Sequence, residues 1–174
     1  MVEHGTAPVV FLCTGNAARS VIAGAALAAL LPDRPVRTAG TLVVEGQPMS
    51  WRTRAAMESV GVAVPDHRSR QATAADLGHA DLVIALAPEH VHWVRRSHPA
   101  ASARTGTLRR LARDLEGGPA PLADRVRALG LADLELEDWE EVVDPGGGDA
   151  ATFAECAHEV SRLIDALAPR LAAP

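Results

Sequence analysis

Short apolar runs alternate with alanine- and leucine-rich stretches of helical character along the chain. Apolar runs that are bounded by turn residues indicate strands buried on both faces of a parallel sheet. The predicted strands span residues 9–12, 36–41, 81–87 and 103–107. The predicted helices span residues 20–31, 50–60, 88–96, 108–115, 121–129 and 150–168. This alternation of strands and helices predicts an α/β fold.

Boundary residues support several of these helices. Pro32 is expected to end the first helix, and Ser50 and Gly61 are expected to cap and stop the second. The Gly117-Gly118-Pro119 sequence breaks the helix that precedes it, and Pro169 is expected to end the last helix. The pattern therefore predicts helices that alternate with the strands.

Length and composition are those of one domain, residues 1–174. A chain of 174 residues with 48% hydrophobic content can bury one core, and no internal repeat is visible. The net charge is −5, and all 17 basic residues are arginine. This balance argues against a nucleic-acid partner or an anionic membrane surface. We expect the acidic stretch 133–141 to be a solvated loop, and the oligomeric state stays open.

The segment from Cys13 to Ser20 carries the strongest chemical signal. It follows an apolar strand and precedes a helix, so its backbone N–H groups and the helix dipole favour a bound anion. The same dipoles favour the thiolate form of Cys13, which is the nucleophilic form. Arg19 suits bidentate binding of a tetrahedral oxyanion. Gly15 permits a tight turn, and Asn16 tolerates a left-handed backbone.

The whole loop is therefore predicted to bind phosphate, with Cys13 as nucleophile. Ser20 is expected to donate a hydrogen bond to the sulfur and so help it to leave as thiolate in a second step. The residues expected to contact substrate are Thr14, Gly15, Asn16, Ala17, Ala18, Arg19 and Ser20. The alternative is a buried strand-end cysteine followed by an ordinary surface arginine.

These residues resemble the low-molecular-weight protein tyrosine phosphatase family, whose signature is Cys-x-Gly-Asn-x-x-Arg-Ser after the first strand. The segments 38–41, 67–71, 80–84 and 143–145 are similar to further family segments, so the resemblance covers almost the whole chain. It implies a single doubly wound domain with a four-stranded parallel sheet, helices on both faces and the phosphate-binding loop after the first strand. It also implies phosphomonoester hydrolysis through a cysteinyl-phosphate, with no metal and no cofactor.

Asp144 is the predicted general acid. A leaving alkoxide or phenoxide needs a proton, and the resulting carboxylate can then activate water. Pro145 restricts the local backbone, and the three glycines at 146–148 favour a mobile loop. The position of Asp144 relative to Cys13 resembles that of the family's Asp-Pro acid, whereas an Asp-Pro-Gly turn without a chemical role is the alternative.

Departures from the family leave the substrate open. The chain contains no tyrosine, and Gly146 and Gly147 stand where aromatic residues usually follow the acid. Trp51 and Trp93 are candidates for a replacement aromatic wall. The substrate is a phosphorylated protein, with phosphotyrosine favoured, or a small-molecule phosphate. An arsenate reductase that uses an external low-molecular-weight thiol and a phosphate-binding module without turnover are the competing functions.

The two cysteines lie far apart in sequence and do not indicate a disulfide framework. A nucleophilic thiol needs a reducing compartment, and no signal-peptide pattern is visible, so a cytoplasmic location is expected. Cys156 is expected to be a small buried residue of the last helix, and Trp139 is expected to pack beneath the acid loop. The histidines at 90, 92 and 98 lack the spacing of a closed metal site.

Overall fold

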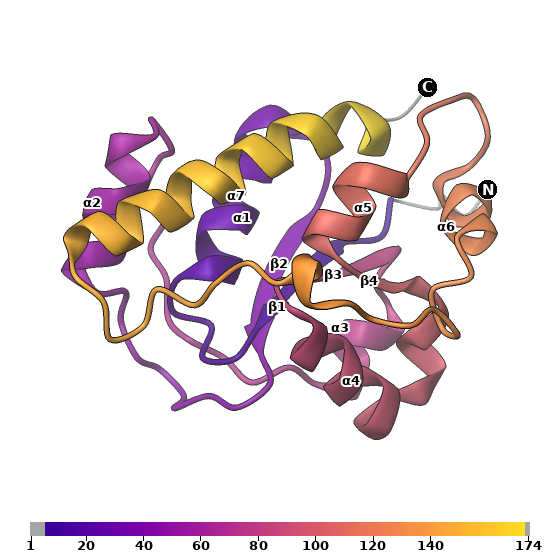
Figure 1. Cartoon of the computed structure of the whole chain (residues 1–174), viewed down its shortest axis with the longest axis horizontal. Helices are drawn as coiled ribbons and strands as arrows, with labels where there is room; N and C mark the ends of the chain where they lie inside the picture. The colour runs from indigo at the N-terminus through magenta and orange to yellow at the C-terminus, as the bar shows by residue number, and fades with distance from the viewer. Residues whose placement is uncertain (1–5, 173–174) are drawn as a thin grey trace.

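The computed structural model describes residues 6–172 and contains a four-stranded sheet in the order β2-β1-β3-β4 (Figure 1). All neighbouring strands are parallel, and β1 pairs with both β2 and β3. The strands are β1 (Val9–Cys13), β2 (Val36–Gly40), β3 (Leu82–Ala85) and β4 (Thr105–Thr107). The predicted doubly wound α/β fold is confirmed.

Helices cover both faces of this sheet (Figure 1). They are α1 (Arg19–Leu30), α2 (Trp51–Ser59), α3 (Ala74–Gly78), α4 (Pro88–Ser97), α5 (Leu108–Asp114), α6 (Leu122–Ala128) and α7 (Ala150–Leu171), with 3₁₀ turns at Pro99–Arg104 (η1) and Asp138–Glu140 (η2). The side chains of successive β1 residues point to opposite faces. Phe11 packs into the core beneath α1, α2, α5 and α7, whereas Val10 and Leu12 pack into the core beneath α3, α4 and η1.

One prediction about a helix end is wrong, and one short helix was missed. The last helix continues through Pro169 to Leu171. Pro169 has no backbone N–H to donate to the Asp165 carbonyl. Asp165 lies on the exposed side near the end of the helix, so the loss of this hydrogen bond is tolerated. The short helix α3 was not predicted; a capping box between Thr73 and Asp76 stabilises it.

The strand order determines where the chain can bind a ligand. The chain passes from β1 to β2 on one side of β1 and then crosses to β3 on the other side of β1. In a parallel sheet a crevice opens where the connections diverge in this way, here beyond the carboxyl ends of β1 and β3. The loop that begins at Cys13 lies at this crevice. The segment before Asp144 reaches the same place, because the Val142 N–H donates to the Leu86 carbonyl just after β3 at 2.8 Å.

Candidate active site

Residues 13–20 form a loop from the end of β1 to the first turn of α1, here called the phosphate loop. Helix α1 begins at Arg19, and no side chain of the described residues caps it. Its first N–H groups are therefore left for an anion. Gly40 of β2 approaches the loop so closely that a Cβ there would lie 2.4 Å from the Thr14 carbonyl oxygen. The loop geometry thus depends on a glycine in the neighbouring strand.

The hydroxyl of Ser20 is oriented toward the sulfur of Cys13. The Cys13 Sγ lies 3.0 Å from the Ser20 Oγ, and both side chains are buried. The Asn16 Nδ2 donates to the same Ser20 Oγ at 3.0 Å. Because that oxygen already accepts from the amide, its own proton is free to point to the sulfur. A hydrogen bond donated to sulfur stabilises the thiolate, as the sequence analysis proposed for Ser20.

Asn16 holds the phosphate loop from behind. It has a φ of 51°, so the predicted left-handed backbone is confirmed. Its carbonyl accepts from the Ser69 hydroxyl at 2.8 Å and lies 2.7 Å from the His67 Nε2. Its side-chain oxygen accepts the Arg70 N–H at 3.0 Å, and its Nδ2 donates to Thr38 as well as to Ser20. His67 therefore supports the loop through a hydrogen bond.

Arg19 and Asp144 meet at the mouth of the phosphate loop. The Arg19 guanidinium is buried, and its Nη1 donates to the Val142 carbonyl at 3.0 Å. Its Nη2 lies 3.3 Å from the Asp144 Oδ2. The Asp144 side chain is 57% exposed, and its Oδ1 accepts the Gly146 N–H at 2.9 Å. The acid loop is thus joined directly to the arginine that is predicted to bind phosphate.

The segment before the acid loop is anchored by Glu140. The stretch 133–141 is largely exposed, as predicted for a solvated loop, and Glu140 is its buried exception. Glu140 is fully buried and accepts hydrogen bonds from the Thr107 hydroxyl and the Arg110 guanidinium. Burial alone would raise the pKa of Glu140, but these hydrogen bonds lower it, so the carboxylate stays ionised. Trp139 packs on Arg110 and Arg113 of α5 rather than beneath the acid loop. The partners of Glu140 come from β4 and α5, so no local sequence pattern indicated this anchor.

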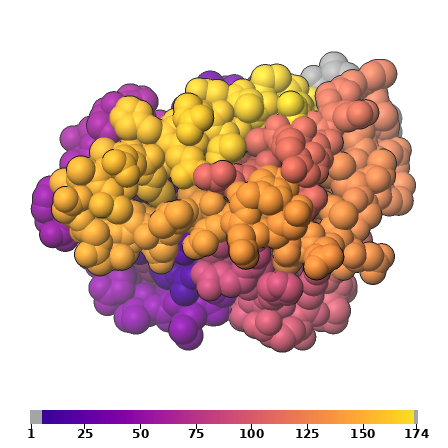
Figure 2. All heavy atoms as spheres, in the orientation of Figure 1, coloured from indigo at the N-terminus to yellow at the C-terminus, as the bar shows by residue number. Residues whose placement is uncertain are grey.

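A pocket of about 290 Å³ opens over the phosphate loop. It is lined by Cys13, Gly15, Ala17, Ala18, Arg19, Ser50, Thr53, Asp144, Gly146 and Phe153. In Figure 2, indigo atoms, which belong to the N-terminal part of the described residues, are visible between the orange and purple segments. The only aromatic lining residue is Phe153, so Trp51 and Trp93 do not form the proposed aromatic wall. Ser50 caps α2 as predicted, but its place in this pocket was missed.

Not every predicted contact residue of the loop points into this pocket. Asn16 and Ser20 lie beneath the loop, and the Thr14 hydroxyl lies 2.9 Å from the His90 Nε2 and 3.2 Å from the Glu89 carboxylate. Burial lowers the pKa of His90 to about 3, and the charge of Arg19 adds to the effect, so His90 is neutral near pH 7. These side chains support the loop rather than line the pocket.

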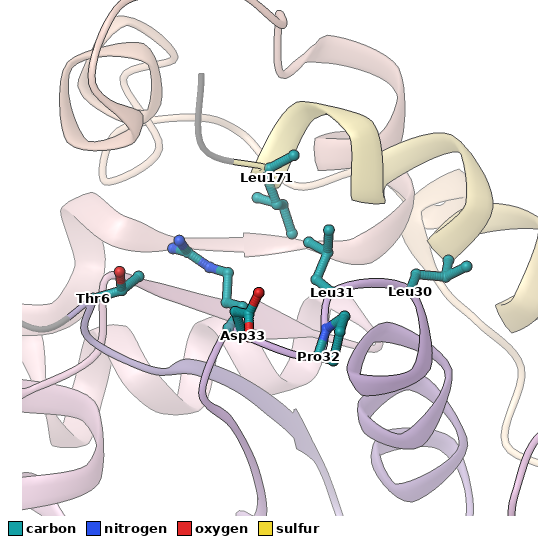
Figure 3. Close-up of a pocket in the computed structure, with 8 residues that line it drawn as sticks. Thr6, Leu30, Leu31, Pro32, Asp33 and Leu171 are labelled. Atoms are coloured by element: carbon teal, nitrogen blue, oxygen red, sulfur yellow. The ribbon is translucent and has the colours of Figure 1, made fainter.

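A second cavity, of about 340 Å³, lies at the opposite end of α1 (Figure 3). Leu30, Leu31, Asp33 and Leu171 are among its lining residues. It holds no cysteine or histidine, so we assign the chemistry to the smaller pocket over the phosphate loop.

The second cysteine and the remaining polar groups do not form another reactive centre. Cys156 is buried in α7 as predicted, and burial raises its pKa to about 12. Over residues 6–172, no three His, Cys, Asp or Glu side chains are grouped closely enough to hold a metal ion. In the same part of the chain, no helix combines the length and apolar character needed to cross a membrane.

Comparison with known proteins identifies the family of this chain. Residues 8–124 match the family model described as low molecular weight phosphotyrosine protein phosphatase. A protein-arginine-phosphatase of Geobacillus stearothermophilus is 27% identical over 164 residues, which is 94% of this chain and 95% of that protein. A probable low molecular weight protein-tyrosine-phosphatase of Ralstonia nicotianae is 26% identical over 165 residues, covering 95% of this chain and 96% of that protein.

Solved structures show the same architecture. The arginine phosphatase from Geobacillus stearothermophilus superposes with a TM-score of 0.76 at 26% identity, covering 95% of this chain and 92% of that one. A low molecular weight protein tyrosine phosphatase from T. tengcongensis superposes with a TM-score of 0.73 at 27% identity, covering 93% and 97%. The chain therefore shares its fold along almost its full length with relatives of two named substrate specificities.

Proposed function

The chain belongs to the low molecular weight phosphotyrosine protein phosphatase family, and we propose that it removes phosphoryl groups from phosphorylated protein side chains. The nucleophile is Cys13, the phosphate ligand is Arg19 and the general acid is Asp144. The observation that carries this assignment is their convergence on one pocket, with the Ser20 hydroxyl 3.0 Å from the sulfur and Arg19 3.3 Å from Asp144.

In the first step, the Cys13 thiolate attacks phosphorus and forms an S–P bond. The bond from phosphorus to the leaving atom breaks, and that atom takes the proton of Asp144. The loop N–H groups and Arg19 stabilise the charge on the phosphoryl oxygens. This step requires substrate to replace the Asp144 carboxylate as the ligand of the Arg19 Nη2. The exposed side chain of Asp144 and the glycines that follow give it room to move.

In the second step, the Asp144 carboxylate takes a proton from water while the water oxygen attacks phosphorus. The S–P bond breaks, inorganic phosphate leaves, and Cys13 returns to its thiolate form. The hydroxyl of Ser20 stabilises the departing sulfur because its proton is free for that bond.

Phosphotyrosine is the first candidate substrate, since the matched family model and several relatives are named for it. Phosphoarginine is the second candidate, because it is the substrate class in the name of a relative that matches along almost the whole chain. A separate observation favours it: Ser50, Thr53 and Gly146 line the pocket, and Phe153 is the one aromatic lining residue that could stack on a tyrosine ring.

Turnover of matched peptides tests the proposal and separates the two substrates. Phosphate release is measured from a phosphotyrosine peptide and from a phosphoarginine peptide that differs only at the phosphorylated residue, beside small sugar and nucleotide phosphates. The peptide with the higher kcat/KM identifies the substrate. The phosphorylated peptides should give a higher kcat/KM than the sugar and nucleotide phosphates. Release from metabolite phosphates alone would contradict the assignment to protein substrates.

Arsenate reduction has weaker support. The Asp144 carboxyl group lies at the mouth of the pocket, where it can protonate a leaving atom. Reduction of arsenate by a thiol has no alkoxide or phenoxide leaving group to protonate. Assay of thiol-dependent arsenate turnover beside phosphatase activity tests this alternative directly.

Replacing Asp144 with asparagine should affect substrates according to their leaving groups. An alkyl phosphate needs the proton, so its kcat/KM is expected to fall by about 10²-fold or more. para-Nitrophenyl phosphate has a good leaving group, so its kcat/KM should change far less. The measurement is kcat/KM for both substrates with the wild type and Asp144→Asn.

The matched control is Glu141→Gln, which neutralises an exposed carboxylate of the same segment. It should leave both substrates near wild-type values. Equal and small losses on both substrates in Asp144→Asn would show that Asp144 is a turn residue only. Glu140 is not a substitute acid, because its carboxylate is buried against Thr107 and Arg110.

A further inference from the structure

Another concave site lies behind the phosphate loop, at the edge of the sheet formed by β2. Its volume is about 350 Å³, and it is here called the β2-edge pocket. It is lined by Arg37, Thr38, His67, Arg68 and Arg70. Three guanidinium groups and an imidazole therefore surround one open concavity in a protein whose net charge is −5.

The positive charge of the β2-edge pocket is only partly neutralised by the protein. The Arg70 Nη2 lies 2.6 Å from the Asp76 Oδ1, and the Arg37 Nη1 lies 3.8 Å from the same oxygen. The other oxygen of Asp76 accepts hydrogen bonds from Thr73. The Asp76 carboxylate thus interacts with two guanidinium groups and also forms part of the cap of helix α3.

Arg68 has no carboxylate partner among residues 6–172. Its Nη1 reaches only the Gly46 carbonyl, at 3.4 Å. Two other acidic residues lie nearby in the chain: Glu45 accepts the Gln71 N–H at 2.7 Å, and Asp66 precedes His67 and is exposed. Asp76 is the one carboxylate of residues 6–172 that forms ion pairs with the arginines of the pocket, so the three guanidinium groups outnumber their paired carboxylates and favour an anionic ligand.

We infer that the β2-edge pocket binds a second phosphate group, separate from the one in the phosphate loop. Planar guanidinium groups bind phosphate oxygens through paired N–H donors, and Arg37 and Arg68 are both exposed and free to turn toward a ligand. The phosphate is that of a small free ion or a second phosphate on the substrate protein. This site goes beyond the proposed function, because binding there does not require the chemistry of Cys13.

The β2-edge pocket is connected to the phosphate loop through Asn16. His67 and Arg70 line the pocket and also hold Asn16, through its carbonyl and its side-chain oxygen. Thr38 lines the pocket and accepts from the Asn16 amide at 3.0 Å. A bound phosphate would thus contact the residues that hold the phosphate loop in its left-handed turn.

Calorimetric titration with pyrophosphate tests the site by counting equivalents. The wild type is expected to bind pyrophosphate at two sites, and the double variant Arg37→Ala/Arg68→Ala at one. The control Arg96→Ala/Arg127→Ala removes the same charge from exposed positions on α4 and α6 and should keep both sites. Loss of a site in the control as well would show a general charge effect and would overturn the proposal.

Alkylation of Cys13 blocks the phosphate loop, so binding at the β2-edge pocket can be measured alone without a mutation in the loop. Iodoacetate should modify Cys13 and place a carboxymethyl group in the phosphate loop, whereas Cys156 is spared because burial raises its pKa to about 12. Alkylated wild type should keep one site, and the alkylated double variant should keep none. The proposal is wrong if alkylated wild type binds no pyrophosphate.

Turnover measurements keep this result distinct from the proposed function. Arg37→Ala/Arg68→Ala should hydrolyse para-nitrophenyl phosphate with kcat/KM within about twofold of wild type, since neither residue lines the catalytic pocket. A raised KM only for a doubly phosphorylated peptide assigns the second phosphate to the substrate protein. Equal KM values for singly and doubly phosphorylated peptides, with one pyrophosphate site lost, assign it to a free ion.

Discussion

Replacing Cys13 with serine is expected to lower kcat by at least about 10⁴-fold on every phosphorylated substrate, while the fold and oxyanion binding survive. Serine is nearly the same size, so the loop N–H groups and Arg19 keep their positions. A serine hydroxyl is a far weaker nucleophile than a cysteine sulfur, and the sulfur of Cys13 lies 3.0 Å from the Ser20 Oγ. No S–P bond can then form at a useful rate.

The measurements for Cys13→Ser are single-turnover phosphate release, thermal unfolding and binding of inorganic phosphate. Cys156→Ala is the matched control, because it removes the other thiol, which is buried in helix α7. It should keep kcat near the wild-type value even if the unfolding temperature falls. Substantial turnover by Cys13→Ser would exclude Cys13 as the nucleophile.

Replacing Arg19 with lysine should be nearly as damaging as replacing it with alanine, with a loss in kcat/KM of about 10²- to 10³-fold. The guanidinium is buried and makes two directed contacts, with the Val142 carbonyl and with Asp144. An ammonium group keeps the charge but cannot present two parallel N–H donors to a phosphoryl group. The positive charge of a lysine at position 19 is therefore not expected to be sufficient for phosphoryl binding.

Steady-state kinetics on para-nitrophenyl phosphate and on a phosphopeptide measure this loss. Arg127→Lys is the matched control, because Arg127 is exposed on α6 and should tolerate the exchange. Circular dichroism checks that both lysine variants are folded. Wild-type kcat/KM in Arg19→Lys would show that Arg19 is not the bidentate ligand of phosphate.

Much of the fold was predictable because its signals are local. The apolar run at 9–12 identified β1, and the change from that run to a helical pattern across residues 13–20 located the phosphate loop between β1 and α1. The backbone of a strand, loop and helix depends mainly on neighbouring residues. The short helix α3 and the end of α7 were missed, because a capping box and one tolerated proline outweighed the average pattern.

The sequence by itself determined the order of the strands and of every helix except α3, the loop from Cys13 to Ser20 and the candidate acid at 144. These features follow from contiguous residues or, for Asp144, from the resemblance to a known family. Only the tertiary structure decided what surrounds them. The Val142 carbonyl that holds Arg19, the Glu140 anchor, the Ser50 and Thr53 wall and the β2-edge pocket all join distant segments. Contacts of this kind depend on how parallel strands bring their carboxyl ends to one edge, and no local pattern in the chain encodes which distant side chains meet there.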